Sequence, residues 1–143
     1  MPKGTIIPGA LLLLVLAKAV LAGESAVVIA NPDTGLDGIS RETVRAIFAM
    51  RQRTLPEGAG AAHVFVLADQ HPLHEHFAKE ILDVYPHQLR LAWDRLVFSG
   101  TGQAPNEVSS PVEMRRRVAN TPGAVGYLTQ GGVDESVIIV PVE

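Results

Sequence analysis

The sequence predicts an α/β domain in which a sheet is covered by helices, and three observations lead to this prediction. The chain has 143 residues, of which 47% are hydrophobic, so it is long enough for one domain of ordinary size. Short apolar runs typical of buried strands alternate with segments whose apolar residues recur at helical spacing. The 13 glycines and 10 prolines are spread along the chain and indicate many turns rather than a low-complexity tract.

Composition also excludes several functions. The chain has no cysteine, which excludes disulfides, thiolate catalysis and cysteine-ligated zinc. Its formal net charge of −3 argues against a nucleic-acid-binding protein, which would carry a basic surplus.

Residues 1–22 are predicted to be a secretory signal peptide. Lys3 gives a basic start, an apolar run of about a dozen residues follows, and small residues precede Gly23. Lys18 interrupts the apolar run, which leaves it short for a helix that crosses a bilayer of ~30 Å. An uncleaved N-terminal anchor is the alternative. The predicted mature domain covers residues 23–143 and is periplasmic or secreted.

The first half of this domain is predicted to fold as strand, helix, strand. Residues 26–30 are an apolar run that ends at Asn-Pro-Asp, as expected of a buried strand. Ser40 is placed to cap a helix that extends to about residue 50. Residues 51–62 are polar and glycine-rich, which predicts a loop, and residues 63–68 form the second apolar strand.

The second half supplies three helices and two strands. Prolines suited to a first helical turn begin the helices at residues 72–84 and 86–97, and residues 99–105 must form a loop. Ser110 starts a Ser-Pro-Val-Glu capping box for a helix that reaches about residue 119. Two apolar strands complete the domain, residues 124–128 and 137–140.

Two polar segments are candidate ligand contacts. In α/β sheets, ligands lie at the carboxyl ends of strands, against helix N-termini. Asp69, Gln70 and His71 follow the second strand and precede a helix. The loop at residues 99–105 begins with Ser99, Gly100 and Thr101, whose hydroxyls and flexible amides are typical of anion-binding turns.

Three segments of the chain carry motifs of one known family. Residues 39–48 end in Ile-Phe, residues 93–105 read Trp-Asp-Arg-Leu-Val-Phe-Ser-Gly-Thr-Gly-Gln-Ala-Pro, and residues 121–127 read Thr-Pro-Gly-Ala-Val-Gly-Tyr. Together these segments resemble the PstS-like phosphate-binding proteins of ABC transporters, and especially their short members with a single lobe. The resemblance covers residues 27–128.

The resemblance implies a single lobe of a type 2 periplasmic binding protein, with a central mixed sheet flanked by helices. It also implies an exported solute-binding protein for phosphate or a related oxyanion, with an ABC transporter or another periplasmic protein as partner. The family grips its oxyanion with a Ser-Gly-Thr turn at a helix start. Here His71 stands where that serine is expected, and the glycine is absent. We therefore expect weak anion binding that strengthens on acidification, because a protonated imidazole adds a donor and a charge.

Other interpretations of these residues remain open. The loop at Ser99 to Thr101 also fits a tight connection without any ligand. His71, His74 and His76 form a cluster that could capture a metal, and surface histidines on an exposed helix face are the alternative. We predict no bound cofactor.

The sequence offers no pattern of catalytic residues. Ser99 lacks a nucleophile elbow, and no carboxylate pair stands out. We therefore predict a protein that is not an enzyme. Its function is solute binding or, as the alternative, protein interaction or sensing by a domain that has lost the ligand site.

Overall fold

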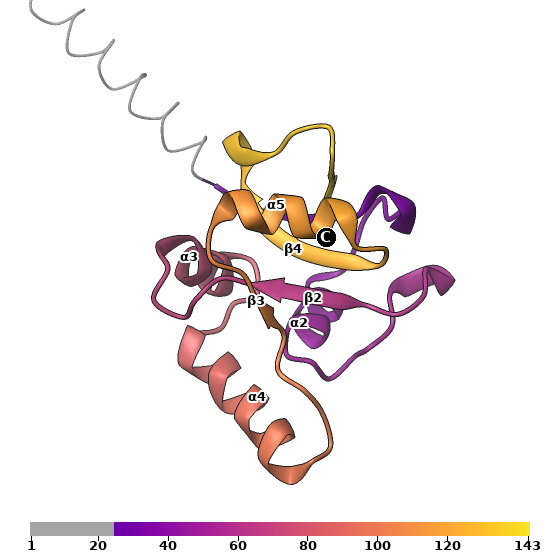
Figure 1. Cartoon of the computed structure of the whole chain (residues 1–143). Helices are drawn as coiled ribbons and strands as arrows, with labels where there is room; N and C mark the ends of the chain where they lie inside the picture. Colours follow the sequence, from indigo (N-terminus) through magenta and orange to yellow (C-terminus); the bar gives the residue numbers. More distant parts are fainter. Residues whose placement is uncertain (1–24) are drawn as a thin grey trace, which may run out of the picture.

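The computed structural model describes residues 25–143, so the predicted signal peptide lies outside the described residues. This part of the chain consists of five strands, four α-helices and three short 3-10 helices (Figure 1). The strands are β1 (Ala26–Ala30), β2 (His63–Val66), β3 (Asn106–Glu107), β4 (Ala124–Thr129) and β5 (Ile138–Val140). The α-helices are α2 (Arg41–Phe48), α3 (Pro72–Glu80), α4 (Pro86–Ser99) and α5 (Pro111–Asn120). Short 3-10 helices lie at Pro32–Thr34, Pro56–Gly58 and Gln130–Gly132.

The strands form one mixed sheet in the order β3-β2-β4-β1-β5. β2 runs parallel to both β3 and β4, whereas β1 runs antiparallel to β4 and β5. The prediction of an α/β fold with a mixed sheet is confirmed. The sequence did not predict β3, which has only two residues, both of them exposed.

Helices cover both faces of the sheet. Gly126 and Tyr127 are consecutive on β4 and therefore face opposite sides. On one side, Met114 of α5 lies so close that a Cβ on Gly126 would stand 2.6 Å from its Sδ. On the other side, the Tyr127 ring stacks on Phe77 of α3, with centroids 4.1 Å apart. The Gly-Tyr pair that ends the Thr-Pro-Gly-Ala-Val-Gly-Tyr motif therefore packs against α5 on one face of the sheet and against α3 on the other.

The middle of α4 is anchored by Trp93, which is 1% exposed. Its indole N–H donates to the carbonyl of Phe48 at the end of α2, at 2.9 Å. Phe48 in turn packs edge-on against Phe77, with centroids 4.8 Å apart. α2, α3 and α4 thus share one apolar layer.

The predicted N-terminal cap of α2 is correct, whereas the predicted C-terminal ends of α2 and α3 lie too far along the chain. Ser40 accepts the amide N–H of Thr43 at 3.1 Å, as predicted for a cap of α2. α2 ends at Phe48 rather than residue 50, because Met50 takes a left-handed conformation with φ 63°. α3 ends at Glu80 rather than residue 84, and Asp83 beyond it also has a positive φ of 56°.

At α5 the predicted capping box is only half formed. Ser110 accepts the amide N–H of Glu113 at 3.1 Å. The Glu113 carboxylate accepts from the amide of Ser109 at 2.8 Å and not from Ser110. No helix within residues 25–143 combines the length and the apolar character needed to cross a bilayer.

Candidate functional site

The carboxyl edge of the sheet brings two helix starts together. β2, β3 and β4 are parallel, so their carboxyl ends meet at one edge of the sheet. Five residues separate the end of β2 from the start of α3, and α5 begins shortly after β3. A pocket of about 370 Å³ lies at this edge. Its lining comes from the starts of both helices and the end of β4, namely His71, Pro72, Leu73, His76, Pro111 and Thr129.

His71 is the N-cap of α3. Its Nδ1 accepts the amide N–H of Leu73 at 3.1 Å, as a capping serine would through its hydroxyl. Nδ1 must therefore be unprotonated, which leaves Nε2 as the N–H donor of the ring. A doubly protonated ring and this cap exclude each other. The expected gain in anion binding on acidification thus requires the imidazole to leave the cap.

Asp69 is held within the chain by Arg90 of α4. The guanidinium donates twice, through Nε and Nη2, and each N–O distance is 2.9 Å. The pKa of the Asp69 carboxyl is lowered from its ordinary value, chiefly by the hydrogen bond from Arg90. Arg90 also lies over the ring of Trp93, 5.1 Å from its centroid. Asp69 therefore positions α3 against α4, while the neighbouring Gln70 is exposed.

His74 is fully buried, which the sequence reading missed. We expected surface histidines on an exposed helix face, but His74 is 0% exposed beneath the first turn of α3. His74 lies three residues before Phe77 and therefore on the apolar face of α3. This helical spacing could have predicted its burial from the sequence. The three histidines accordingly point to different environments, since His76 pairs with Glu80 at 3.0 Å.

A buried hydrogen-bond chain links His74 to the end of β2. The amide of Leu67 donates to the Tyr127 hydroxyl at 2.8 Å, and this hydroxyl bonds Nδ1 of His74. If the hydroxyl donates, His74 Nε2 carries the ring proton, and this buried atom has no hydrogen-bond partner. Burial lowers the pKa of His74, with Asp69 partly opposing that shift. Burial likewise raises the pKa of Tyr127.

Within residues 25–143, no group of three or more His, Asp or Glu side chains is arranged to hold a metal ion. His74 gives its Nδ1 to Tyr127, and His71 gives its Nδ1 to the cap of α3. The cluster suggested by the sequence spacing is therefore not assembled around one point.

The second predicted segment lies elsewhere. Ser99, Gly100 and Thr101 stand at the C-terminal end of α4, and Gly100 and Thr101 border a pocket with His63, at the opposite end of β2 from Asp69. The two predicted segments therefore do not meet at one site. Sequence order could not reveal this, because it does not fix the direction in which α4 leaves the sheet.

The amides of this loop are already engaged. Gly100 adopts a left-handed conformation with φ 72° and donates to Val97 O at 3.2 Å. Thr101 and Gly102 both donate to the carbonyl of Leu96, at 3.1 and 3.2 Å. These bonds cap the end of α4, where the helix dipole is negative and disfavours anions. The geometry therefore gives Ser99, Gly100 and Thr101 a capping role and offers no nest for a ligand.

Comparison with known proteins supports the fold through solved structures. No protein-family model matches the sequence, and no curated protein matches it. An ABC-type phosphate transport receptor from Vibrio cholerae has a TM-score of 0.63 at 15% identity, over 82% of this chain and 46% of the receptor chain. A putative phosphate ABC transporter substrate-binding protein from Clostridium perfringens, solved with bound phosphate, has a TM-score of 0.66 at 16% identity, over 82% and 44%.

PstS from Borrelia burgdorferi has a TM-score of 0.63 at 13% identity, over 88% of this chain and 53% of PstS. The fold is that of one lobe of PstS-type receptors. The chain spans about half the length of these receptors. At identities of 13–16% the likeness concerns the fold alone, and the predicted single-lobe architecture is confirmed.

Proposed function

We propose that this protein is an exported, non-catalytic solute-binding protein whose single PstS-type lobe binds a small oxyanion at the carboxyl edge of the sheet. The observation that carries the proposal is the pocket between the starts of α3 and α5. Its lining contains two imidazoles and no carboxylate, and the positive end of the α3 dipole lies beside it. The ligand contacts in this proposal are His71, through Nε2, and the first turn of α3.

Phosphate is the first ligand to test because structural neighbours of this lobe include a protein solved with bound phosphate. An ABC transporter is the corresponding partner, and the segment at residues 1–22 is the corresponding export signal. Both are parts of the proposal. Asp69 and His71 already have hydrogen-bond partners within the chain, which favours weak binding over a tight receptor.

A second candidate is an interaction or sensing domain without an anion ligand. Glu113 favours it, because its carboxylate already accepts the Ser109 amide at the start of α5 and takes the place that an anion would fill there. The two candidates differ in one property, the affinity of the α3 start for an oxyanion.

Calorimetric titration with sulfate and phosphate tests the proposal. Sulfate keeps its charge between pH 5.5 and pH 8 and reports on the protein alone, provided that the ionic strength is fixed. We expect weak, saturable binding at pH 8 through the neutral ring, and His71→Ser should weaken it because serine can keep the cap but lacks Nε2. Stronger binding at pH 5.5 would show that the imidazole has left the cap. Thr101→Ala is the matched control and should bind as wild type does. Absence of binding of either anion at both pH values overturns the proposal in favour of the interaction domain.

A further inference from the structure

A second, larger concave surface lies on the other side of the molecule from α5. It is a groove of about 860 Å³ between α2 and α4. Its floor and walls are mostly apolar, with Ala49 and Leu89 buried and Ala92 and Leu96 half-buried. Phe98 stands at one end of the groove and is 85% exposed. An apolar surface of this kind in a small domain indicates a binding site.

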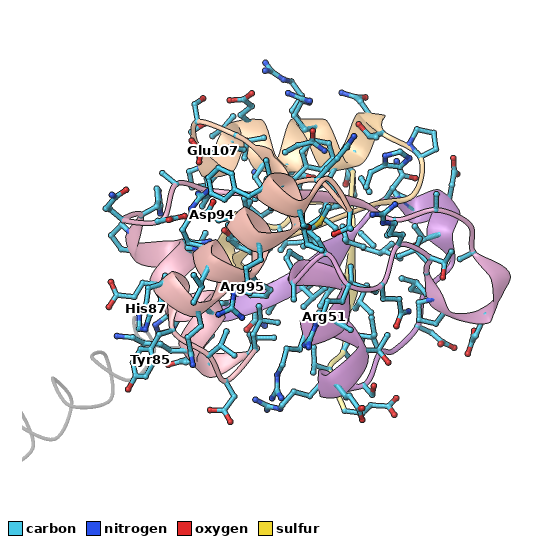
Figure 2. All side chains as sticks on the ribbon, turned by 90° about the horizontal axis from the view of Figure 1, so that it is seen from below. Arg51, Tyr85, His87, Asp94, Arg95 and Glu107 are labelled. Atoms are coloured by element: carbon cyan, nitrogen blue, oxygen red, sulfur yellow. The ribbon has the colours of Figure 1, made fainter. Side chains whose placement is uncertain are left out.

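Among the residues that the structure describes, the charged residues that line this groove are all arginines. The whole chain carries 15 acidic and 12 basic residues, yet the groove is lined by Arg45, Arg51 and Arg95 and by no carboxylate. Figure 2 shows Arg95 extending from α4 and Arg51 from the segment after α2, on the face seen from below. The hydrogen bond with Asp69 raises the pKa of Arg90 most, Asp94 and Glu107 raise it further, and neither of these two lines the groove.

Two of these arginines are available to a ligand. Arg45 donates through Nε to the carbonyl of Leu82 at 2.7 Å, which fixes its side chain along the wall. Among the ion pairs of residues 25–143, none includes Arg51 or Arg95. Neither guanidinium is engaged by a carboxylate within these residues, so each can bind an anionic head group in bidentate geometry.

From these observations we propose that the α2–α4 groove binds a single-chain amphiphilic anion, with an alkyl body on the apolar floor and a carboxylate or similar head group on Arg51 and Arg95. The site is separate from the pocket at the start of α3, and the proposal does not depend on oxyanion binding there.

The charge of the groove disfavours two occupants that belong to the chain itself. The apolar segment at residues 1–22 carries Lys3 and Lys18 and would bring like charges to the arginines. A second copy paired through the same groove would likewise place arginines against arginines.

The length of the groove suits an extended alkyl chain. From Gln88 to Ser99 the groove follows α4 for roughly 16 Å, at ~1.5 Å per residue. An alkyl chain can lie along this apolar floor with its charged end at the arginines.

Titration of the purified protein with dodecanoate, below its micelle-forming concentration, tests this proposal by calorimetry. The N-terminus of the preparation is established by intact mass, because residues 1–22 are themselves apolar. We expect saturable binding of one dodecanoate per chain. Acetate, which has the head group alone, and dodecyltrimethylammonium, which has the alkyl chain with the opposite charge, should bind at least tenfold more weakly.

Three variants locate the site. Arg51→Gln and Arg95→Gln should each weaken dodecanoate binding by about tenfold, and Ala92→Leu should abolish it by filling the floor. Arg116→Gln, which removes an exposed arginine of α5, is the matched control and should leave the affinity unchanged. Circular dichroism melts of each variant separate loss of the site from loss of the fold.

Several results would overturn the proposal. Equal binding of dodecanoate and dodecyltrimethylammonium would indicate a nonspecific apolar surface, and equal effects of Arg116→Gln and Arg95→Gln would indicate general charge attraction. Absence of dodecanoate binding, together with sedimentation that shows a dimer, would assign the groove to a second copy of the chain. If dodecanoate does not bind but an acidic amphipathic peptide does, the groove belongs to a partner protein.

Discussion

The start of α3 and the end of α4 offer similar groups, polar side chains beside backbone amides in a turn, but their chemistry is opposite. At the start of α3 the helix dipole is positive, and His71 alone caps the first turn. At the end of α4 the dipole is negative, and the amides of Gly100, Thr101 and Gly102 already donate hydrogen bonds to carbonyls of the helix. The direction of the helix, rather than the residue types in the turn, thus decides which turn can receive an anion.

Trp93 anchors α4 to the end of α2, and its removal should have the largest effect on the free energy of unfolding. The side chain is buried and its indole bonds Phe48 at the end of α2. Trp93→Ala should lower the free energy of unfolding by about 3–5 kcal/mol through cavity formation. Urea denaturation of both proteins measures this. A loss below about 1 kcal/mol would mean that α4 is not anchored there.

Tyr127→Phe tests the buried chain beneath the start of α3. The substitution keeps the stacking on Phe77 but leaves the Leu67 amide without its acceptor. We expect a loss of about 1–3 kcal/mol, the cost of a buried unsatisfied donor. Denaturation midpoints at pH 7.5 report it. A neutral substitution would show that the hydroxyl is not needed by β2.

The buried imidazole of His74 should make stability depend on pH. Its pKa is lowered in the fold, chiefly by burial, with Asp69 raising it and Arg90 and His71 lowering it. Below an ordinary pKa of ~6.5 the unfolded chain binds a proton that the folded chain does not, so stability falls as pH decreases from that value. Above it, His74 has no effect on the pH dependence.

The slope for one group cannot exceed about 1.4 kcal/mol per pH unit. Comparing wild type with His74→Gln from pH 7.5 to pH 5 cancels the contribution of the other histidines. We expect the difference between the two proteins to change below about pH 6.5. Parallel curves over the whole range would contradict the burial of a neutral His74.

The two turns themselves should differ when single side chains are removed. His71→Ala deletes the cap of α3 and should cost about 1 kcal/mol. Thr101→Ala removes an exposed hydroxyl whose partner is Ser99, and should change stability by less than about 0.5 kcal/mol. Thermal melts of both variants measure the two losses of stability. Equal losses would contradict the expected difference between the two turns.

Local signals predicted most of the fold. Ser40 and Ser110 cap the helices that they were expected to cap, and the four apolar strands are present. The sequence did not predict β3 because its two exposed residues form a strand only by pairing with β2, and no local sequence pattern indicates that pairing. Asp69, Gln70 and His71 directly precede α3, as their position in the sequence predicts.

The rest of the site depends on contacts between segments far apart in the sequence. Asp69 meets Arg90 and His74 meets Tyr127 only after folding, so their spacing in the sequence carries no signal. The loop at Ser99 to Thr101 was expected to contact a ligand because its composition is typical of an anion-binding turn. Its actual place depends on the length and direction of α4, which tertiary packing sets.

The most direct test of the oxyanion site is a sulfate titration followed by amide chemical shifts in nuclear magnetic resonance. The account predicts that the largest shifts occur in the first turn of α3, beginning at His71, and saturate with the same affinity as in calorimetry. The amides of Gly100, Thr101 and Gly102 should not move, because they are bonded to α4 carbonyls. Saturating shifts at the end of α4 with none at the start of α3 would contradict it.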